Sequence, residues 1–322
     1  MAQTVQVAIE QGDITTIDAD VIALKFAQSP HGTDRLVANK LVALGIAADS
    51  LRPSIGQTRL VATKGVVTAR SALFVGTPAI YDMSYADVRT LAATALAALK
   101  TVAPDTTHVA MTIHGPGFGL DEIESCLSQL YGFQDSIRAG VYPPELRRIT
   151  IVDHHAGRVE RLRQGVSARS VALEFRSGGE GVQPGAPAPD MPAKPHAFVA
   201  MPFNDYFQDV YHYGIQAPVH QAGLLCERMD HLNFTGEIVE WMKHKIETAT
   251  VVIAEVTDGN PNVYLEIGYA WGKGRPTILI AKDVGVLAFD VRGHRCLQYG
   301  SITALEQTLV RELRELHARQ LI

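Results

Sequence analysis

"TVVIAEVTDGNPNVYLEIGYAWGKGRPTILIAK", residues 250–282, is the stretch that decides the fold class of this chain. Its two ends, TVVIAEVT and RPTILIAK, are apolar runs rich in β-branched residues, which is typical of buried strands. Between them, NVYLEIGYAWGKG has the length and composition of a helix. A strand, a helix and a second strand in this order predict a parallel sheet with a crossover helix.

The same alternation extends through the C-terminal half of the chain. We expect strands at 196–203 and 224–230, and helices at 204–223, 235–249 and 302–321. This pattern predicts a three-layer α/β domain of the flavodoxin or Rossmann type with a parallel sheet. In such sheets, ligands bind beyond the carboxyl ends of the strands.

A segment poor in bulky apolar residues divides the chain in two. Residues 177–196, SGGEGVQPGAPAPDMPAKPH, are dense in glycine and proline, and such a segment buries too little surface to offset its ordering entropy. We therefore expect an N-terminal domain over 1–166, a linker over 167–196 and a C-terminal domain over 197–322. SVALEFRS, residues 170–177, is either a closing strand or the start of the linker. The N-terminal half also alternates strands and helices, so both domains are expected to be three-layer α/β structures.

Composition limits the classes of function. The 322 residues carry a formal net charge of −5, which argues against a broad nucleic-acid-binding surface. The three cysteines have no metal-ligand spacing, so no metal site and no disulfide framework are expected. We see no signal peptide in the sequence. We also see no apolar run of the roughly 18 residues that a membrane helix needs. The expectation is a soluble, cytoplasmic protein without a cofactor or membrane partner.

Polar turns follow the predicted C-terminal strands at 201–205, 227–233 and 255–262, and all three belong to one edge of the sheet. Glu266 follows the third turn, Glu255 ends its strand and Asp258 lies in the loop. A carboxylate there suits attack on a sugar C1′ or stabilisation of an oxocarbenium ion, and a second carboxylate could act as acid or base. Alternatively, Glu266 is an acid favoured by the helix dipole and Asp258 is a turn residue.

AFVAMPFNDYFQDVY, GLLCERMD and the segment 246–280 together resemble the nucleoside 2-deoxyribosyltransferase-like family and its TIR-like relatives. The resemblance implies cleavage of N-glycosidic bonds with Glu266 as the catalytic glutamate. Deoxynucleosides, nucleotides or NAD+ are the substrates of different members. It implies that Met201, Pro202 and Phe203 contact the base or ribose. Arg228 and Asp230 would bind a phosphate or a ribose hydroxyl. Asn262 would help to shape the pocket. Arg228 could instead form a surface salt bridge with Glu227 or Asp230.

QGDIT at 11–15, followed by IDADVI at 17–22, is similar to the start of macro domains, which bind ADP-ribose. HVAMTIHGPGFGLDEIESCLSQL, residues 108–130, is typical of a strand, a glycine-rich loop and a helix, a context suited to anions. The resemblance implies an adenine contact from Asp13 and a phosphate loop with His114, Gly115, Gly117 and Gly119.

One departure from the macro-domain pattern bears on catalysis in the N-terminal domain. The Asn-Ala-Ala-Asn run of hydrolytic macro domains is absent at 23–32, so we expect no catalysis there. The N-terminal domain of leucine aminopeptidases has a related fold, and a scaffold that binds nothing is the alternative. His154 and His155 are expected on opposite sides of a strand, which argues against a joint metal site.

A macro-like module joined to a glycosidase-like module suggests a sensor and an effector in one chain. The leading hypothesis is a nucleotide N-glycosidase that cleaves NAD+ when a nucleotide signal binds the N-terminal domain, as in bacterial anti-phage defence. Ligand-driven homo-oligomerisation is expected by analogy. The alternatives are a deoxyribosyltransferase or nucleoside monophosphate hydrolase of salvage, and a nucleotide sensor without catalysis.

Overall fold

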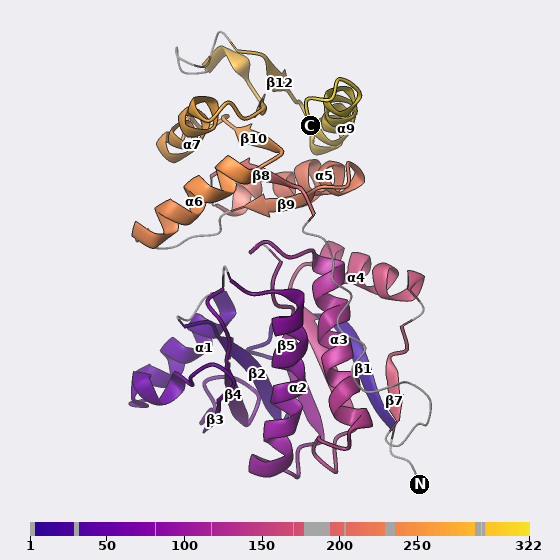
Figure 1. Ribbon diagram of the computed structural model, residues 1–322. Coiled ribbons are helices and arrows are strands. Elements are labelled where there is room, and N and C mark those ends of the chain that lie inside the picture. The colour runs from indigo at the N-terminus through magenta and orange to yellow at the C-terminus, as the bar shows by residue number, and fades with distance from the viewer. Residues whose placement is uncertain are drawn as a thin grey trace. The chain divides into compact units, whose positions relative to one another are not determined.

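The structure of the protein, a computed structural model, describes residues 4–28, 32–80, 82–116, 118–169, 171–176, 194–202, 204–228, 236–286, 291 and 294–322. The chain divides into two compact units, Met1–Met191 and Pro192–Ile322. Each unit is an α/β structure with its own sheet (Figure 1). The α/β fold class predicted from the sequence is thereby confirmed.

The N-terminal unit contains a mixed sheet of seven strands in the order β3-β4-β2-β5-β6-β1-β7. Neighbouring strands are parallel except at the two edges, where β3 pairs antiparallel with β4 and β7 antiparallel with β1. The strands are β1 Thr4–Gln11, β2 Val21–Phe26, β3 Thr58–Ala62, β4 Ser71–Gly76, β5 His108–Thr112, β6 Arg148–Asp153 and β7 Glu174–Arg176.

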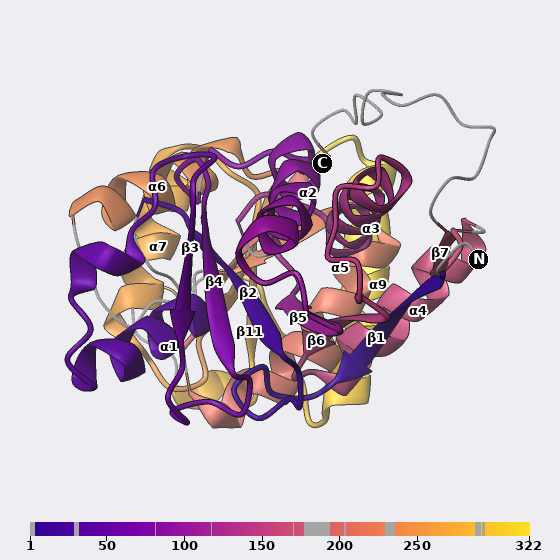
Figure 2. The same ribbon diagram turned by 90° about the horizontal axis from the view of Figure 1, so that it is seen from below.

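Helices cover both faces of this sheet. The helices are α1 Gly32–Ala43, the 3-10 turn η1 Ala48–Leu51, α2 Tyr85–Val102, α3 Glu122–Arg138 and α4 Ala156–Ala168. α2 and α3 lie side by side over one face (Figure 2), and α1 packs on the other. Ser84 and Asp87 form a capping box that fixes where α2 begins.

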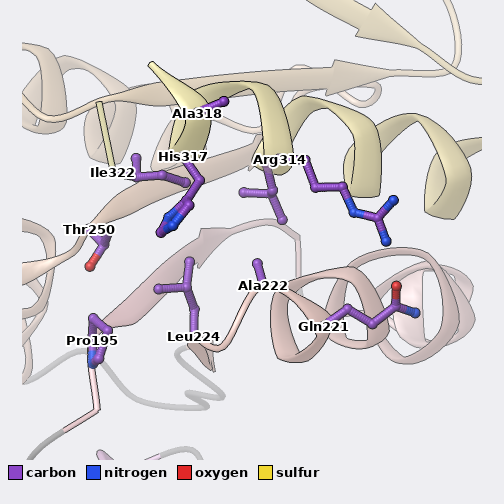
Figure 3. A pocket seen from close by; sticks show the side chains of 10 residues that line it. Pro195, Gln221, Ala222, Leu224, Thr250, Arg314, His317, Ala318 and Ile322 are labelled. Atoms are coloured by element: carbon purple, nitrogen blue, oxygen red, sulfur yellow. The ribbon is translucent and has the colours of Figure 1, made fainter. Parts of the chain in front are cut away.

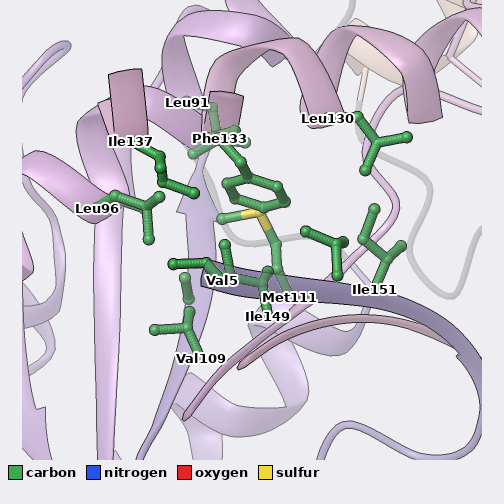
Figure 4. Packing of buried hydrophobic residues seen from close by; sticks show 14 of the residues in the cluster. Val5, Leu91, Leu96, Val109, Met111, Leu130, Phe133, Ile137, Ile149 and Ile151 are labelled. Atoms are coloured by element: carbon green, nitrogen blue, oxygen red, sulfur yellow. The ribbon is translucent and has the colours of Figure 1, made fainter. Parts of the chain in front are cut away.

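The larger core of the N-terminal unit lies between the sheet and the pair α2 and α3. Phe133 from α3 lies over Met111 of β5, with Leu91 and Ile137 beside it (Figure 4). Both Phe133 and Met111 are completely buried. Burial of apolar side chains on this scale is the main stabilising contribution to such a unit.

The N-terminal unit extends past residue 166, where the first domain was expected to end. α4 continues to Ala168, and β7 at Glu174–Arg176 pairs with β1. Residues up to Arg176 that were expected in the linker therefore complete an edge of the sheet.

The C-terminal unit contains a sheet of five parallel strands in the order β12-β11-β10-β8-β9. The strands are β8 His196–Ala200, β9 Leu225–Arg228, β10 Val251–Glu255, β11 Thr277–Ala281 and β12 Cys296–Gln298. The helical elements are η2 Asp205–Phe207, the π-helix η3 Val210–Gln216, α5 Ala217–Gln221, α6 Gly236–Thr248, α7 Pro261–Gly272, η4 Val284–Val286 and α9 Ile302–Ala318. The single helix expected at 204–223 is thus three consecutive elements.

The two faces of this sheet are covered by different helices. η3, α5 and α9 pack on the face to which Val251 and Ile253 of β10 contribute. α6 and α7 lie on the other side (Figure 1). Because side chains alternate along a strand, Val252 and Ala254 face α7.

Within the described ranges, no helix is both long enough and apolar enough to cross a membrane.

Candidate functional site

α7 begins immediately after the central strand β10, so its first turns lie near the carboxyl edge of the sheet. The Asn260 side chain accepts a hydrogen bond from the amide of Asn262 at 2.9 Å, and Pro261 occupies the first helical position. The buried positions of α7 are Val263, Glu266, Ile267 and Ala270. Their spacing of three, four and seven residues marks one helical face, so Glu266 lies on the face that packs against the sheet.

Glu266 is a buried carboxyl group in apolar surroundings. The residue is 8% exposed, and none of the described residues forms a hydrogen bond or ion pair with its side chain. Burial raises the pKa of Glu266 to about 8. At neutral pH the carboxyl group of the ligand-free protein is therefore mostly protonated.

Glu255, in contrast, is fully buried and hydrogen-bonded. Its carboxylate accepts from the Thr257 hydroxyl, and from the Tyr299 hydroxyl at 3.2 Å. Burial raises the pKa of Glu255, and the Thr257 hydrogen bonds oppose this shift. Lys282 donates its amide to the Thr257 hydroxyl at 3.0 Å, so Glu255 connects the ends of β10, β11 and β12.

The two carboxyl groups lie on opposite sides of the sheet. Glu255 has the same parity in β10 as Val251 and Ile253, and its partner Tyr299 belongs to the same core cluster as those residues. Glu266 lies on the α7 side. Glu255 is therefore placed to position the edge of the sheet, and the structure does not pair it with Glu266 as a second acid or base.

Met201 and Arg228 lie together on the same side as Glu255. A guanidinium nitrogen of Arg228 donates to the Met201 sulfur at 3.8 Å and another donates to Gln208 at 3.2 Å. The guanidinium also lies over the ring of Tyr211, 4.1 Å from its centroid. Arg228 is only 5% exposed, so it is not a surface residue, and Asp230, one of the two salt-bridge partners considered from the sequence, lies outside the described residues.

The remaining predicted residues of the C-terminal site differ in placement. Pro202 is buried after β8, whereas Asp258 is exposed in the β10–α7 connection and Asn262 is exposed in the first turn of α7. Phe203 and Asp230 lie outside the described residues.

Tyr206 and Lys282 were not predicted as site residues. The ammonium group of Lys282 hydrogen-bonds the Tyr206 hydroxyl and lies 4.2 Å from the centroid of its ring. Tyr206 is 58% exposed, which is unusual for so large an aromatic side chain. A lysine directly after a buried strand was the available signal for this pair.

In the N-terminal unit, Asp13 is exposed and engaged locally. Its carboxylate accepts from the amide and the hydroxyl of Thr15, both at 2.8 Å, which forms an Asx turn. Its second carboxylate oxygen has no described partner, so one oxygen is available to a ligand.

The glycine-rich loop leads into α3, but the first amides of that helix are occupied. Asp121 accepts from the amides of Ile123 and Glu124 at 2.8 and 3.1 Å. These are the amides that would bind an anion at a helix N-terminus. Any anion at this loop must therefore be held by other groups.

Two glycines of this loop have backbone conformations that favour glycine. Gly115 and Gly119 have φ angles of +106° and +94°. A Cβ atom on Gly115 would lie 2.7 Å from Leu120 and 2.9 Å from the Ser125 hydroxyl. Gly117 lies outside the described residues.

His114 is buried beside a buried ion pair. Lys25 of β2 hydrogen-bonds Asp34 of α1, and both residues are at most 9% exposed. Burial, and secondarily the charge of Lys25, lower the pKa of His114 well below its usual value. The His114 ring nitrogens and the Ser125 hydroxyl have no hydrogen-bond partner among the described residues, which leaves polar groups available there.

No group of three or more histidine, cysteine, aspartate or glutamate side chains in the described part of the chain is arranged to hold a metal ion.

Neither a protein-family model nor a curated protein sequence matches the chain. Among solved structures, the chain is similar to the Oceanobacillus iheyensis macrodomain with MES bound, with a TM-score of 0.41 and 12% identity over 53% of this chain and 98% of that one. It is also similar to the macrodomain of Mycobacterium tuberculosis DarG, with a TM-score of 0.36 and 15% identity over 46% of this chain and 97% of that one.

A third structural likeness is to the Clostridium botulinum CMP N-glycosidase BcmB, with a TM-score of 0.32 and 17% identity over 36% of this chain and 98% of that one. Macrodomains are thus among the similar structures, as the sequence resemblance implied. All three likenesses are distant, with identities of 17% or less. The catalytic assignment of the C-terminal unit stays a prediction.

Proposed function

We propose that the C-terminal unit is an N-glycosidase that cleaves the bond between base and ribose in a nucleotide. Glu266 is the carboxylate that reacts at C1′. The observation that carries this proposal is the position of Glu266, a buried carboxyl group without a described partner, on the helix that follows the central strand. An acid that served only to complement the helix dipole would gain nothing from being buried.

The proposed reaction starts with the N-glycosidic bond breaking, its electron pair passing to the base nitrogen. The Glu266 carboxylate stabilises the positive charge that forms at C1′ or bonds to that carbon as an ester. Water then bonds to C1′ through its oxygen and gives up one proton to the solvent, which releases the sugar and restores the Glu266 carboxylate. The apolar surroundings favour this step, because charges interact more strongly where water is excluded.

We propose NAD+ as the substrate. Its nicotinamide ring is positively charged, and a nearby positive charge lowers the pKa of a carboxyl group. Bound NAD+ would therefore return Glu266 to the ionised form that the reaction needs. Nicotinamide also leaves as a neutral molecule without a proton donor, which fits a site where Glu255 lies on the other side of the sheet.

A second candidate substrate is a nucleoside monophosphate or deoxynucleoside, as in salvage. The base of such a substrate is uncharged and needs a proton as it leaves. The protonated form of Glu266, favoured by its raised pKa, could supply that proton. Arg228 would then be the contact for a phosphate, since a guanidinium can bind it in bidentate fashion. Because Arg228 lies on the Glu255 side of the sheet, such a substrate would have to extend across the carboxyl edge of the sheet from Glu266.

The N-terminal unit is proposed to bind a nucleotide that activates the C-terminal unit. The exposed carboxylate oxygen of Asp13 that has no described partner supports this, because a ligand can reach it. The nitrogens of His114 also lack a described partner, but the residue is buried and a ligand would have to open the loop to reach it. A role in defence against phage would follow from NAD+ loss in the infected cell. It predicts that expression of the chain reduces phage plaque formation, and that the Glu266→Gln variant does not.

The test is mass-spectrometric detection of released base from NAD+, nucleoside monophosphates and deoxynucleosides, with and without cyclic and ADP-ribose-type nucleotides. We expect nicotinamide release that Glu266→Gln lowers by at least about 100-fold, the scale of a lost catalytic group. Glu315→Gln, an exposed carboxyl group on α9, is the matched control and should keep full activity. Glu255→Gln, whose carbonyl oxygen still accepts from Thr257 and Tyr299, should keep most of it.

The outcomes separate the candidates. Release from a monophosphate or deoxynucleoside without an activator would replace the gated NAD+ reaction by the salvage reaction. No release from any substrate, together with nucleotide binding, would leave a sensor and remove the catalytic role of Glu266. Equal activity of Glu266→Gln and wild type would contradict the assignment directly.

A further inference from the structure

A cavity of about 490 Å³ lies within the C-terminal unit at the amino edge of its sheet, opposite the edge where Glu266 and Arg228 are placed. Its floor is formed by residues that directly precede β8, β9 and β10, namely Pro195, Leu224 and Thr250. Its roof is the last part of α9 (Figure 3). The volume is within the range of roughly 300 to 1,000 Å³ that is typical of small-molecule pockets.

The apolar wall of this cavity is aliphatic. Pro195, Ala222, Leu224, Leu313, Ala318 and Ile322 line it. Apart from His317, none of the described lining residues has an aromatic ring. A base or another aromatic ligand therefore has little to stack on in this cavity. An aliphatic body fits this wall, and its burial supplies a binding contribution that grows with its apolar area.

Arg314 is the cation among the described side chains of the cavity. It projects from α9 toward Gln221, whereas His317 projects toward Leu224 and Thr250 at the other end of the opening (Figure 3). None of the described lining residues is acidic, and Arg314 has no ion-pair partner among the described residues. Its neighbour Arg295, by comparison, is paired with Glu312 at 2.7 Å.

Backbone groups at the floor do not compete for a ligand. The amide of Leu225 donates to the Pro195 carbonyl at 2.9 Å, and the amide of Thr250 donates to the His196 carbonyl at 2.8 Å. Recognition of a polar head group therefore falls to the side chains, above all to Arg314. A guanidinium binds a carboxylate through two parallel hydrogen bonds, which is stronger and more specific than a neutral contact.

We propose that this cavity is a binding site for a small amphipathic anion, an aliphatic chain that ends in a carboxylate, with the Arg314 guanidinium as the contact for the carboxylate. The site is separate from the glycosidase site, and the proposal does not depend on the reaction of Glu266.

The experiment is a calorimetric titration of the full chain with octanoate and with octanamide, which has the same aliphatic chain and an uncharged head. Octanoate should bind, and octanamide should bind about tenfold more weakly or worse, since the difference is one charge-assisted bidentate contact. Arg314→Gln should lower octanoate affinity by a similar factor. Ala318→Glu places a negative charge at an exposed helix position that lines the cavity, and it should also lower octanoate affinity.

Two controls make the result specific. Arg311→Gln removes a guanidinium from α9 that does not line this cavity, and it should leave octanoate affinity unchanged. Glu266→Gln should also leave it unchanged, which separates this site from the proposed glycosidase site. Urea midpoints that match wild type would show that the Arg314, Arg311 and Ala318 variants are folded.

Equal affinity for octanoate and octanamide, equal losses in Arg314→Gln and Arg311→Gln, or no octanoate binding at millimolar concentration would each overturn the proposal. Octanoate binding that disappears as protein concentration rises would also overturn it, because a second copy of the chain would then be the occupant.

Discussion

At the scale of single residues, two glutamates of the same unit show how surroundings decide a role. Glu255 is fully buried with hydroxyl donors from Thr257 and Tyr299, whereas buried Glu266 has no described donor. Hydrogen bonds stabilise the ionised form of a carboxyl group and desolvation disfavours it. Glu255 therefore holds a sheet edge together, and Glu266 is the group whose charge state a ligand can change.

The raised pKa of Glu266 predicts how the stability of the C-terminal unit depends on pH. An unfolded glutamate titrates near 4.5 and folded Glu266 near 8, so between these values the folded unit keeps a proton that the unfolded chain has released. The contribution of Glu266 to the free energy of unfolding is therefore complete below about pH 4.5, and it falls as the pH rises to 8. The loss is about 1.4 kcal/mol per pH unit, or roughly 5 kcal/mol in total.

Glu266→Gln removes this titration, and the variant should be more stable than wild type at pH 8 and similar to it at pH 5. Urea unfolding followed by tryptophan fluorescence is the measurement, because both tryptophans of the chain, Trp241 and Trp271, lie in the C-terminal unit. Glu315→Gln should show no such difference between the two pH values. A variant less stable than wild type at pH 8 would mean that Glu266 has an ionic partner in the folded protein.

At the scale of secondary-structure elements, the contact between α2 and α3 depends on one glycine. A Cβ atom on Gly132 would lie 2.1 Å from the carbonyl oxygen of Arg89 and 2.8 Å from the Cβ atom of Ala92. Neither atom can move without shifting α2. Arg89 also forms a hydrogen-bonded ion pair with Asp135 of α3 at 2.6 Å, so the same turn of α2 carries both interactions.

Gly132→Ala should destabilise the N-terminal unit by about 2 kcal/mol or more, because the added methyl group forces the two helices apart. Gly268→Ala is the contrasting variant. Its Cβ atom would meet nothing within 4 Å, and alanine within a helix is favoured over glycine by about 1 kcal/mol. Thermal unfolding followed by far-UV circular dichroism would compare the two. A neutral Gly132→Ala would show that α2 and α3 separate more easily than their contact indicates.

At the scale of the whole molecule, the chain contains two units, each with its own sheet and its own apolar core. A core is the source of cooperative unfolding, so we expect each unit to unfold as a separate transition. Tryptophan fluorescence reports only the C-terminal unit, whereas circular dichroism reports both.

The expected result is that Gly132→Ala shifts the circular-dichroism transition of the N-terminal unit and leaves the fluorescence transition unchanged. Glu266→Gln should do the opposite at pH 8. Calorimetry of wild type and both variants provides the measurement. If one substitution moved both transitions by the same amount, the two units would unfold as a single cooperative system.

Much of the fold could be predicted from the sequence, because apolar runs and helical spacing are local properties of the chain. The strand, helix and strand of 250–282 appear as β10, α7 and β11, and the burial of α7 follows its spacing of apolar residues. The end of the N-terminal unit was less predictable. β7 is three residues long, and only its antiparallel pairing with β1 makes it part of the sheet.

The sequence by itself determined the α/β class and the parallel C-terminal sheet, since these follow from periodicity and from order along the chain, and the family resemblance indicated Glu266 as the candidate catalytic residue. Only the tertiary structure decided that Glu255 lies on the other side of β10, that Lys25 pairs with Asp34, and that α9 closes a cavity over the strand starts. The physical reason is that desolvation and pairing depend on segments far apart in the sequence. A carboxyl group acquires its pKa from everything that packs around it, and the local sequence contains only a small part of that.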